Sequence, residues 1–595
     1  MIQEIGSMIC QLRNKVFVTQ ESLGRGLLSV PELSRIENGE KESDSFLMTA
    51  LFQRLGKSMD QFEMTVSNEE YKLILLRAFI QESMESGDYD RTEELLDEYE
   101  DSKESEKGLH VQYVGMIRAI LGHMNGGTRE KCLEDLKCAM SLTFTEEERR
   151  VDWTGYCFCI QEVQLLMLIA HFEMEAGFNR EAMILLEKLH DCVDLTYTSE
   201  VSKVQVYPKC CYLLAKAYLK EGRPEDAYAV AEKGIQNLVK TRFLTFVEEL
   251  LTTQQECEWS EEREEQIKAL HFAYELAEYR LPESFVVRLL FGGICDELTL
   301  NHELIREMRV AQGMTQEEVS YGICSRETLS RIEKGRTPSR KKLQELLQRL
   351  GIERERYSSY VVTDDWDTFE LVREYKGNCL KENQEDANDI LSDIEPRLDM
   401  SITANRQFVE TAKVRHLIRK REISWEDGIK RLEELLRYTM PEYNGKLLRI
   451  PTREEFLILN RIALSLKLSG RREDAIDLYE EILQKYQASK VKAEHHSFVM
   501  MMLYFNYLEL LESSDYVEKA KDIGKVGIKL TMRYHRGDWT AMFLANTACV
   551  YEKIETQAED SLVLSCLKAS SHLLDFFRME KKCRAVRRYI EDIDT

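Results

Sequence analysis

The chain has 595 residues, of which 31% are charged, and it contains only 8 prolines and 28 glycines. This composition predicts several mostly helical domains with short connections, and it excludes a long disordered region. The net charge of −25 excludes a chain that is basic throughout, so any surface that attracts a polyanion must be local.

The cysteines and the apolar segments indicate a reduced, cytoplasmic protein that does not enter membranes. The fifteen cysteines are an odd number and show neither a recurring CxxC pair nor a zinc-binding spacing. The N-terminus lacks the basic segment and apolar core of a signal peptide. The longest apolar run, residues 498–505, is too short to span a bilayer. No glycine-rich phosphate loop, HExxH motif or nucleophile elbow occurs, so we expect no enzyme, no metal site and no cofactor.

Residues 1–65 contain a pattern that recurs in the middle of the chain. Segments 19–21 and 33–39 match segments 315–317 and 329–335 at an offset of 296 residues. Further matches, at offsets of 295 and 293, join 53–56 with 348–351 and 177–182 with 470–475. The nearly constant offset predicts an internal duplication of a unit of about 295 residues, in which two short helices are followed by a helical array.

The first copy of the two-helix pattern differs from the second at the start of its second helix. Val30 and Pro31 stand where the second copy has Arg326 and Glu327, and neither can hydrogen-bond to a base edge. Proline is tolerated in the first turn of a helix, so the local fold can survive. Residues 1–62 hold seven Lys/Arg and eight Asp/Glu. Two interpretations remain, a DNA-binding module of relaxed specificity or a degenerate copy kept for packing, and we favour the second.

Residues 66–290 are predicted to form pairs of antiparallel helices. One pair has Ala215 on its first helix, a turn at Gly222 and Ala227 on its returning helix, and a similar turn lies at Gly177. Small residues at these positions let two helices approach closely. The pattern resembles tetratricopeptide repeats, which stack into a curved solenoid with a concave binding surface.

Residues 300–357 contain the second and better-formed copy of the two-helix pattern. Thr315 can cap the first helix, and Glu318 follows at the capping-box spacing. Gly322 supplies the turn, and Ser325 can cap the second helix.

The second of these helices has the chemistry of a helix that enters the DNA major groove. Leu329 and Ile332 lie three residues apart and bury one face, which leaves arginine and glutamate exposed at its N-terminal end. The segment resembles the phage-repressor, or Xre, class of helix-turn-helix, which implies double-stranded DNA as a partner. The resemblance implies base-reading side chains at Arg326, Glu327, Ser330 and Arg331, and phosphate contacts at Gln316, Lys334 and Arg336.

The charge around this segment agrees with that interpretation. Residues 303–356 hold twelve Lys/Arg and nine Asp/Glu, a net charge of +3, so the rest of the chain carries −28. A basic module on an acidic body can bind DNA, because phosphate contacts act within about a Debye length. The alternative is an ordinary helical hairpin on the protein surface.

Residues 366–595 are predicted to form a second array with amide side chains on its inner face. Asn460, Asn506 and Asn546 each fall in the first helix of a candidate repeat. An asparagine amide can both donate to and accept from a peptide backbone, and could therefore hold an extended peptide. The alternative is that these side chains are exposed or bond only to local backbone. The matched positions of the first array lack amides; they are Met167, Leu213 and Thr253.

A helix-turn-helix followed by a tetratricopeptide-like array resembles the peptide-pheromone-responsive regulators of Gram-positive bacteria, of the Rgg/PlcR/PrgX type. The resemblance implies an all-α fold in which a helix-turn-helix is followed by one array. The internal duplication departs from this one-copy pattern and predicts four domains, at 1–65, 66–290, 300–357 and 366–595. The resemblance also implies a quorum-sensing transcription regulator whose array binds a short signalling peptide or a partner protein.

Two questions stay open at this stage. The chain could instead be a scaffold or anti-activator that acts through protein contacts without binding DNA, as its acidic total favours. A duplicated chain could mimic a symmetric pair of readers, or two chains could form a homodimer that brings two intact readers to a palindrome.

Overall fold

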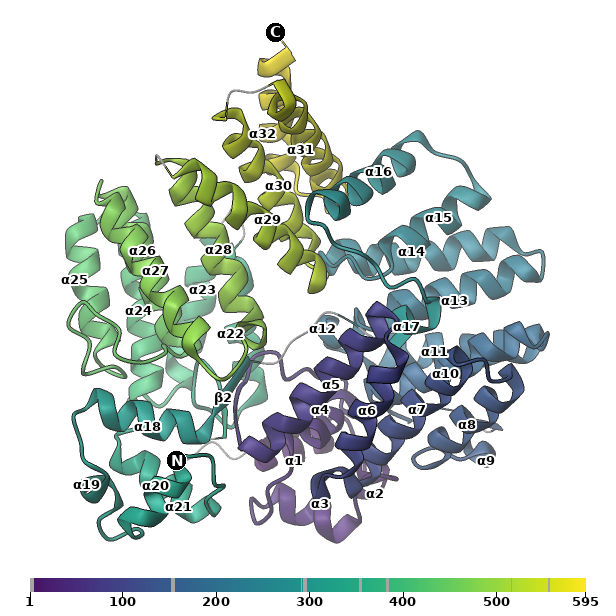
Figure 1. Cartoon of the computed structure of the whole chain (residues 1–595), viewed down its shortest axis with the longest axis horizontal. Coiled ribbons are helices and arrows are strands. Elements are labelled where there is room, and N and C mark those ends of the chain that lie inside the picture. Colours follow the sequence, from purple (N-terminus) through teal and green to yellow (C-terminus); the bar gives the residue numbers. More distant parts are fainter. Residues whose placement is uncertain are drawn as a thin grey trace.

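The computed structural model describes residues 5–150, 153, 156–290, 292, 297–352, 356–380, 385–514, 516–554 and 557–594. The chain is built of helices, as predicted, with one small three-stranded sheet that was not predicted (Figure 1). Within the described ranges, no helix combines the length and the apolar character needed to cross a membrane.

The first helix-turn-helix domain consists of four helices near the N-terminus. They are α1 (Ile5–Lys15), α2 (Gln20–Gly24), α3 (Val30–Glu37) and α4 (Ser45–Arg54). Thr19 caps α2 by accepting from the backbone N–H of Ser22 at 3.1 Å. Leu33 and Ile36 of α3 are buried in a core that also contains Phe52.

The second helix-turn-helix domain repeats this arrangement in the middle of the chain. Its helices are α18 (Asn301–Ala311), α19 (Gln316–Ser320), α20 (Arg326–Ile332) and α21 (Arg340–Arg349). Thr315 and Glu318 form the predicted capping box on α19. Ser325 caps α20 by accepting from the N–H of Thr328 at 3.2 Å.

The first array consists of helix pairs in which each helix packs antiparallel on the next. Turn glycines such as Gly177 and Gly222 have positive φ angles of 88° and 72°, a conformation that glycine adopts without strain. The paired helices are α5 (Asn68–Ser86), α6 (Tyr89–Glu100), α7 (Gly108–Met124), α8 (Arg129–Ser141), α10 (Ile160–Glu175), α11 (Asn179–Thr196), α13 (Tyr207–Lys220), α14 (Pro224–Thr241), α15 (Val247–Cys257) and α16 (Glu261–Leu276). Shorter helices are η1 (Lys103–Glu106), α9 (Glu146–Arg150), α12 (Glu200–Lys203) and α17 (Phe285–Leu290).

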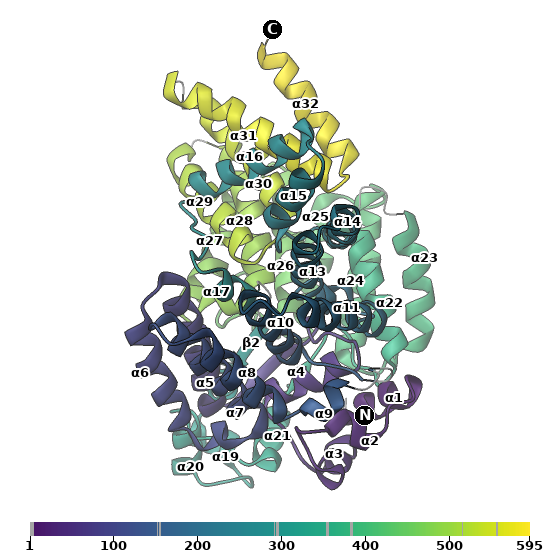
Figure 2. The same cartoon turned by 90° about the vertical axis from the view of Figure 1, so that its right-hand side faces the viewer.

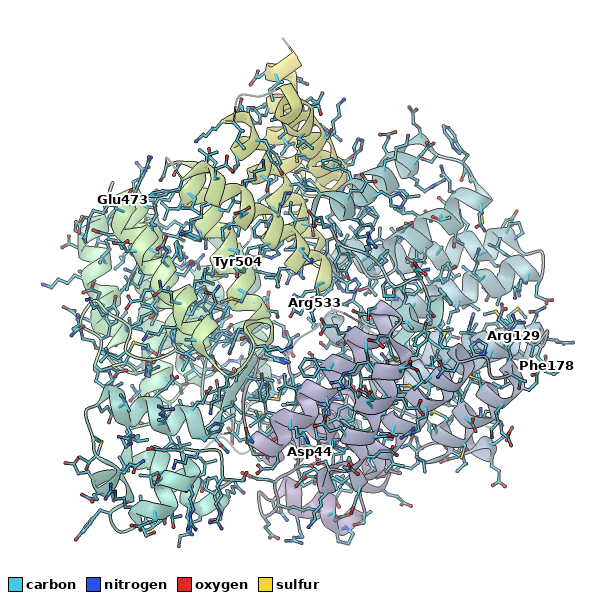
Figure 3. All side chains as sticks on the ribbon, in the orientation of Figure 1. Asp44, Arg129, Phe178, Glu473, Tyr504 and Arg533 are labelled. Carbon is cyan, nitrogen blue, oxygen red and sulfur yellow. The ribbon has the colours of Figure 1, made fainter. Side chains whose placement is uncertain are left out.

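The second array has the same construction and continues to the C-terminus. Figure 3 labels Arg129 and Phe178, at the N-terminal ends of returning helices at the outer edge of the first array, and Glu473, at the same end of a returning helix of the second. The paired helices are α22 (Trp366–Leu380), α23 (Glu385–Ile394), α24 (Thr403–Arg419), α25 (Trp425–Leu436), α26 (Arg453–Leu468), α27 (Arg472–Ala488), α28 (Ser497–Glu512), α29 (Val517–Arg533), α30 (Gly537–Glu552) and α31 (Gln557–Phe576). A last helix, α32 (Glu580–Asp594), packs on α31. Two single turns are η2 (Glu395–Arg397) and η3 (Ala493–His496).

Hydrogen bonds within the first array have counterparts within the second array, at a nearly constant sequence offset. The buried amide of Gln112 donates to the carbonyl of Ala139 at 3.2 Å and to the hydroxyl of Thr143 at 2.8 Å. Gln407, 295 residues later, donates to the matching carbonyl and hydroxyl at 2.7 and 3.1 Å. These shared contacts agree with the duplication, which stays a prediction.

The small sheet ties both helix-turn-helix domains to one end of the molecule. Its strands are β1 (Glu63–Val66), β2 (Glu297–Leu300) and β3 (Tyr357–Ser358), in the order β2-β1-β3. β1 pairs parallel with β2 and antiparallel with β3. Because the strands flank the two domains in the chain, α1–α4 and α18–α21 lie at the same end, opposite the C-terminus (Figures 1 and 2).

The two arrays also meet at the opposite end. Helix α16 packs against α29 and α31 (Figures 1 and 2). The backbone N–H of Leu244 donates to the carbonyl of His535 at 2.7 Å, and that of Gly537 donates to the carbonyl of Arg242 at 3.0 Å. The arrays are therefore joined at both ends.

Candidate nucleic-acid interface

Helix α20 presents polar side chains on the side that faces away from its domain core. Leu329 and Ile332 are buried, so the opposite side of this short helix points outward. Arg326, Glu327 and Arg331 are exposed, and Ser330 is half-buried. The four base-reading side chains predicted from the sequence are thus brought together on one helix, with three of them open to solvent.

A buried carboxylate holds this helix to the two helices before it. Glu333 is 7% exposed and accepts from the guanidinium of Arg309 at 2.6 and 3.1 Å. Gln316, at the start of α19, donates to the same carboxylate at 2.7 Å. The network fixes the angle between α19 and α20, because bidentate Arg–carboxylate pairs have a defined geometry.

The phosphate contacts predicted from the sequence are placed less uniformly. Lys334 and Arg336 follow α20 and are exposed. Gln316 is half-buried and uses one amide N–H on Glu333, which leaves one N–H of the amide for a phosphate. Sequence spacing alone did not reveal this second, structural role of Gln316.

The charged side chain of Arg326 on α20 makes only a weak ion pair with its neighbour Glu317. Arg326 lies 3.4 Å from the carboxylate of Glu317, and the two side chains are 61% and 70% exposed. An exposed pair of this kind contributes about 0–1 kcal/mol, so Arg326 can leave it for a base edge at little cost. Hydrogen bonds from its own backbone N–H and from Ser325 lower the pKa of Glu327, which therefore remains an acceptor at neutral pH.

Part of the basic excess of this domain is used inside the molecule. Arg340 pairs with Glu42 at 3.1 Å and also donates to the carbonyl of Gly39 in the first helix-turn-helix domain. Arg356 pairs with Glu70 of α5. These contacts orient the second domain against the first half of the chain rather than toward DNA.

The two helix-turn-helix domains differ in how their cores connect to the rest of the molecule. The core around Leu33 and Phe52 continues into the sheet and onto Trp366, whose ring lies 5.5 Å from that of Phe52. The core around Leu329 and Ile332 is a separate cluster confined to residues of its own domain. The first domain is thus fused to the body, and the second contacts it mainly through polar groups.

The first domain keeps the supporting network but not the polar surface. Arg13 and Gln20 donate to Glu37 at 2.7, 3.1 and 2.7 Å, nearly the distances of the second domain. The start of α3 instead exposes Val30 and Pro31. This outcome agrees with the predicted loss of base-reading groups.

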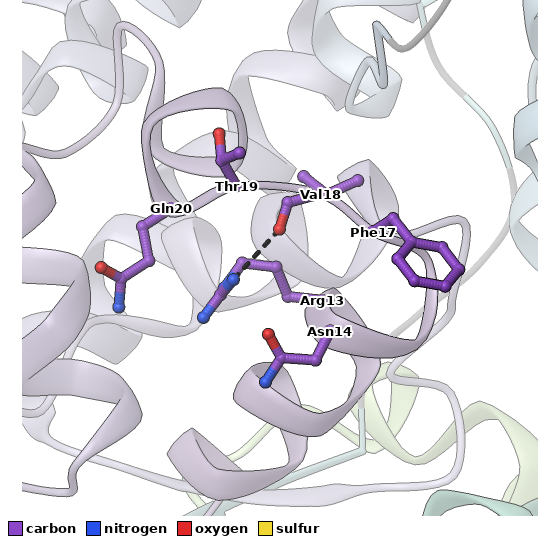
Figure 4. A pocket seen from close by; sticks show the side chains of 6 residues that line it. All are labelled: Arg13, Asn14, Phe17, Val18, Thr19 and Gln20. Atoms are coloured by element: carbon purple, nitrogen blue, oxygen red, sulfur yellow. Dashed lines mark hydrogen bonds between the residues drawn. The ribbon is translucent and has the colours of Figure 1, made fainter.

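One exposed aromatic ring in the first domain was missed by sequence reasoning. Phe17 is 93% exposed and has a φ of 58°, where its counterpart Gly313 has a φ of 67°. Figure 4 shows the ring pointing away from Thr19 and Gln20, beside an open cavity of about 450 Å³. The signal was available in the alignment of the two copies, because a phenylalanine replaces a glycine that precedes the first cap.

The asparagines predicted to hold a peptide are placed unequally. Asn460 is 6% exposed and accepts from the hydroxyl of Tyr479 at 2.9 Å and from the amide of Asn506 at 2.8 Å. Asn506 and Asn546 are half-buried, in the first helices of successive pairs. Asn460 therefore supports Asn506 from beneath, and the structure does not join Asn546 to this pair.

Arg461 follows Asn460 in α26 and was not singled out from the sequence. Its side chain is half-buried, and in the described part of the chain it makes no hydrogen bond or ion pair. Burial, and then the nearby charge of Arg415, lower the pKa of Arg461 to about 10. The matched position of the first array is Leu168, so the contrast between the copies was a usable signal.

Comparisons with known proteins identify the domain that carries this interface. Residues 305–356 match the helix-turn-helix family HTH_3, so this part of the chain is a domain of that family. No protein of curated function matches the chain.

Several solved structures are similar to about half of the chain. PlcR of Bacillus thuringiensis, in complex with the peptide PapR7 and DNA, is 20% identical over 48% of this chain and 98% of its own, with a TM-score of 0.33. The pheromone receptor Rgg2 of Streptococcus dysgalactiae is 13% identical over 49% and 99%, with a TM-score of 0.27. ComR of S. thermophilus, bound to DNA and its signalling peptide ComS, is 12% identical over 50% and 100%, with a TM-score of 0.28.

Proposed function

We propose that the chain is a cytoplasmic, sequence-specific DNA-binding transcription regulator whose second helix-turn-helix domain reads the operator. The observation that supports this most directly is the exposed set of Arg326, Glu327 and Arg331 on a capped helix. Arginine can donate twice to guanine, and glutamate can accept from cytosine, in the major groove. The separate core of this domain allows it to adjust its orientation while the body stays folded.

The same proposal gives the first domain a different role. The apolar start of its α3 and its fused core suit an anchor that positions the second domain. We infer that the halves are duplicates, divided into domains at 1–65, 66–290, 300–357 and 366–595, and that only one copy has kept the reader. Two chains would then be needed to read a palindrome.

We further propose that the second array binds a short peptide or a partner protein through Asn506, Asn546 and Arg461. Half-buried amides suit a peptide backbone, and a half-buried cationic side chain in the same array suits a carboxylate that the peptide ends in or carries. A ligand changes DNA binding only if it binds two arrangements of the array with different affinity.

The test of the DNA-binding proposal compares matched arginines of the two domains. Duplexes selected from a randomised library by the wild-type chain are titrated in gel shifts with Arg331→Ala, Arg326→Ala and the control Arg35→Ala. We expect the first two variants to lose about 1–3 kcal/mol each, or roughly 5- to 150-fold in affinity. Arg35, the counterpart of Arg331, is exposed on α3, and its loss should change affinity by about twofold or less.

Two results would decide against this assignment. Unchanged affinity for Arg326→Ala and Arg331→Ala would remove α20 as the reader. An equal loss for Arg35→Ala would show that the first domain reads DNA as well.

The alternative, a scaffold that does not bind DNA, is favoured by the net charge of −25. Retention of the chain on immobilised duplex DNA separates the two functions. Contacts to phosphate predict a steep loss of retention as salt rises. No retention at low salt would favour the scaffold.

A further inference from the structure

The chain places one of its own segments on the inner face of the first array. After α16 the chain turns back, and α17 lies between α5 and α13 (Figure 1). Its packing contacts include α5 and α10, and the side chains described below extend them to α13 and α15. All four of these are the first helices of their pairs, so α17 occupies the face on which arrays of this kind bind ligands.

The apolar side of α17 fits this face closely. The ring of Phe285 lies 5.1 Å from His171, 5.6 Å from Tyr212 and 6.1 Å from Phe246, measured between ring centroids. Val287 and Leu289 have no exposed surface. The segment therefore buries its side chains as an inserted peptide would.

Polar groups of the array meet the backbone at the C-terminal end of α17. The ammonium of Lys209 donates to the carbonyl of Leu289 at 3.0 Å, and the amide of Gln164 donates to the carbonyl of Leu290. The last carbonyls of a helix have no partner inside the helix, so these two side chains supply the missing donors.

One ion pair gives the contact a charge preference. Arg288 of α17 donates to the carboxylate of Glu249 at 2.6 Å, and the two side chains are only 25% and 12% exposed. A partly buried pair of this geometry discriminates strongly against a segment with the opposite charge at this position.

We propose that the first array is a peptide-binding site that holds residues 281–290 as a tethered ligand. The site selects an apolar segment with one basic residue, which pairs with Glu249. Lys209 and Gln164 hold the segment by donating hydrogen bonds to two of its backbone carbonyls. This inference does not depend on DNA binding. It adds to the proposed function that one of the two arrays is already engaged by the chain itself.

The second array cannot bind the same segment through equivalent hydrogen bonds and an equivalent ion pair. By the offset of 293, Lys209 and Gln164 correspond to Met502 and Leu457, and Glu249 corresponds to Met542. None of the three replacements can make the polar contacts that hold α17. An external ligand of the second array is therefore not selected by these polar contacts, and one chain should bind one such ligand rather than two.

The experiment supplies the segment in trans to the full-length chain. The probe is a fluorescein-labelled synthetic peptide with the sequence of residues 281–290, and its binding is followed by fluorescence anisotropy. The double variant Val287→Ser/Leu289→Ser weakens the tethered copy and should bind one peptide per chain. The wild type should bind it more weakly by a factor on the order of 10–100, because its own segment competes at high effective concentration.

A second peptide with Arg288→Glu tests the charge preference. We expect it to bind the double variant more weakly than the first peptide, by a factor on the order of 30. The proposal is overturned if the double variant keeps native helicity but does not bind the first peptide. It is also overturned if wild type and variant bind equally, or if the two peptides bind alike.

Hydrogen exchange on the wild type covers the case in which the double variant does not fold. Excess free peptide should speed amide exchange of residues 285–290 and leave that of α20 unchanged. Unchanged exchange at 285–290 with the peptide in large excess would overturn the proposal. Neither readout involves DNA, so failure here is distinct from failure of the proposed function.

Discussion

Replacing Arg54 with methionine removes the charge that holds the first helix-turn-helix domain on the first array. Arg54 has no exposed surface and donates to the carboxylate of Glu162 at 2.6 and 3.1 Å. It also donates to the carbonyls of Leu23 and Arg25 at 2.9 and 2.7 Å. One side chain therefore joins α2, α4 and α10.

The expected cost follows from what the substitution leaves behind. Glu162 is also fully buried, and without Arg54 its carboxylate loses its counter-charge. Removing one partner of a buried ion pair costs about 3–5 kcal/mol. The matched control is Arg349→Met, because Arg349 is exposed and makes one hydrogen bond, to the carbonyl of Glu318 at 3.0 Å. We expect that control to cost about 1 kcal/mol or less.

The pH dependence separates this mechanism from a general loss of packing. Burial alone would raise the pKa of Glu162, but the charge and hydrogen bonds of Arg54 outweigh it and hold the pKa below its usual value. In the wild type this stabilisation is present above about pH 4.5 and is lost as the pH falls through the lowered pKa. In Arg54→Met burial raises the pKa of Glu162, so the loss of stability should be smallest in acid and largest at neutral pH.

Thermal unfolding of wild type, Arg54→Met and Arg349→Met between pH 4 and 8 tests this expectation. The variant Arg54→Met/Glu162→Met should recover part of the loss, because it leaves no buried charge. Equal losses for the two single variants, or a loss for Arg54→Met that does not change with pH, would refute the reasoning.

Three further predictions concern other parts of the molecule. A Cβ on Gly537 would lie 2.1 Å from the ring of Phe577 in the same array and 3.0 Å from Leu244 of the first array. Gly537→Ala should therefore lower the melting temperature, and an unchanged melting temperature would contradict this. Asn460→Ala should lower the free energy of unfolding by about 1–3 kcal/mol, because it leaves the hydroxyl of Tyr479 and the amide of Asn506 without their hydrogen-bond acceptor. Asn546→Ala should leave the melting temperature nearly unchanged and affect only the response to a ligand. Equal melting temperatures for the two variants would count against a structural role for Asn460. Burial lowers the pKa of Lys209 to about 7. Wild-type stability should therefore rise between about pH 7 and 10.5, because in this range the unfolded chain binds the proton of Lys209 more tightly than the folded chain does. In melting experiments Lys209→Met should show a smaller rise, and an identical rise would exclude Lys209 as its source.

The second helix-turn-helix domain could be predicted from the sequence because its signals are local. The caps at Thr315 and Ser325 and the buried pair Leu329 and Ile332 lie within a few residues of the groups they organise. The exposed positions of Arg326 and Arg331 follow from that spacing. The helical repeats were predicted for the same reason, since each turn is marked by nearby small residues.

Features that depend on distant segments could not be predicted in this way. β1 pairs with β2 across more than 230 residues, and neither four-residue strand has a pattern that sets it apart from a loop. The burial of Asn460 depends on Tyr479 and Asn506 in neighbouring helices. A match between copies shows that two positions are equivalent, but it does not show what packs against either of them.

The junctions at both ends of the two arrays restrict how the molecule can deform. A solenoid with a free end can increase or decrease its curvature without any change in another part of the molecule. Here a change of pitch in one array must be matched by the other or absorbed where they meet, at α16 and α31 or at the sheet. The sheet joins the two helix-turn-helix domains, so a change in the curvature of the arrays that is absorbed there alters how these two domains are oriented relative to each other.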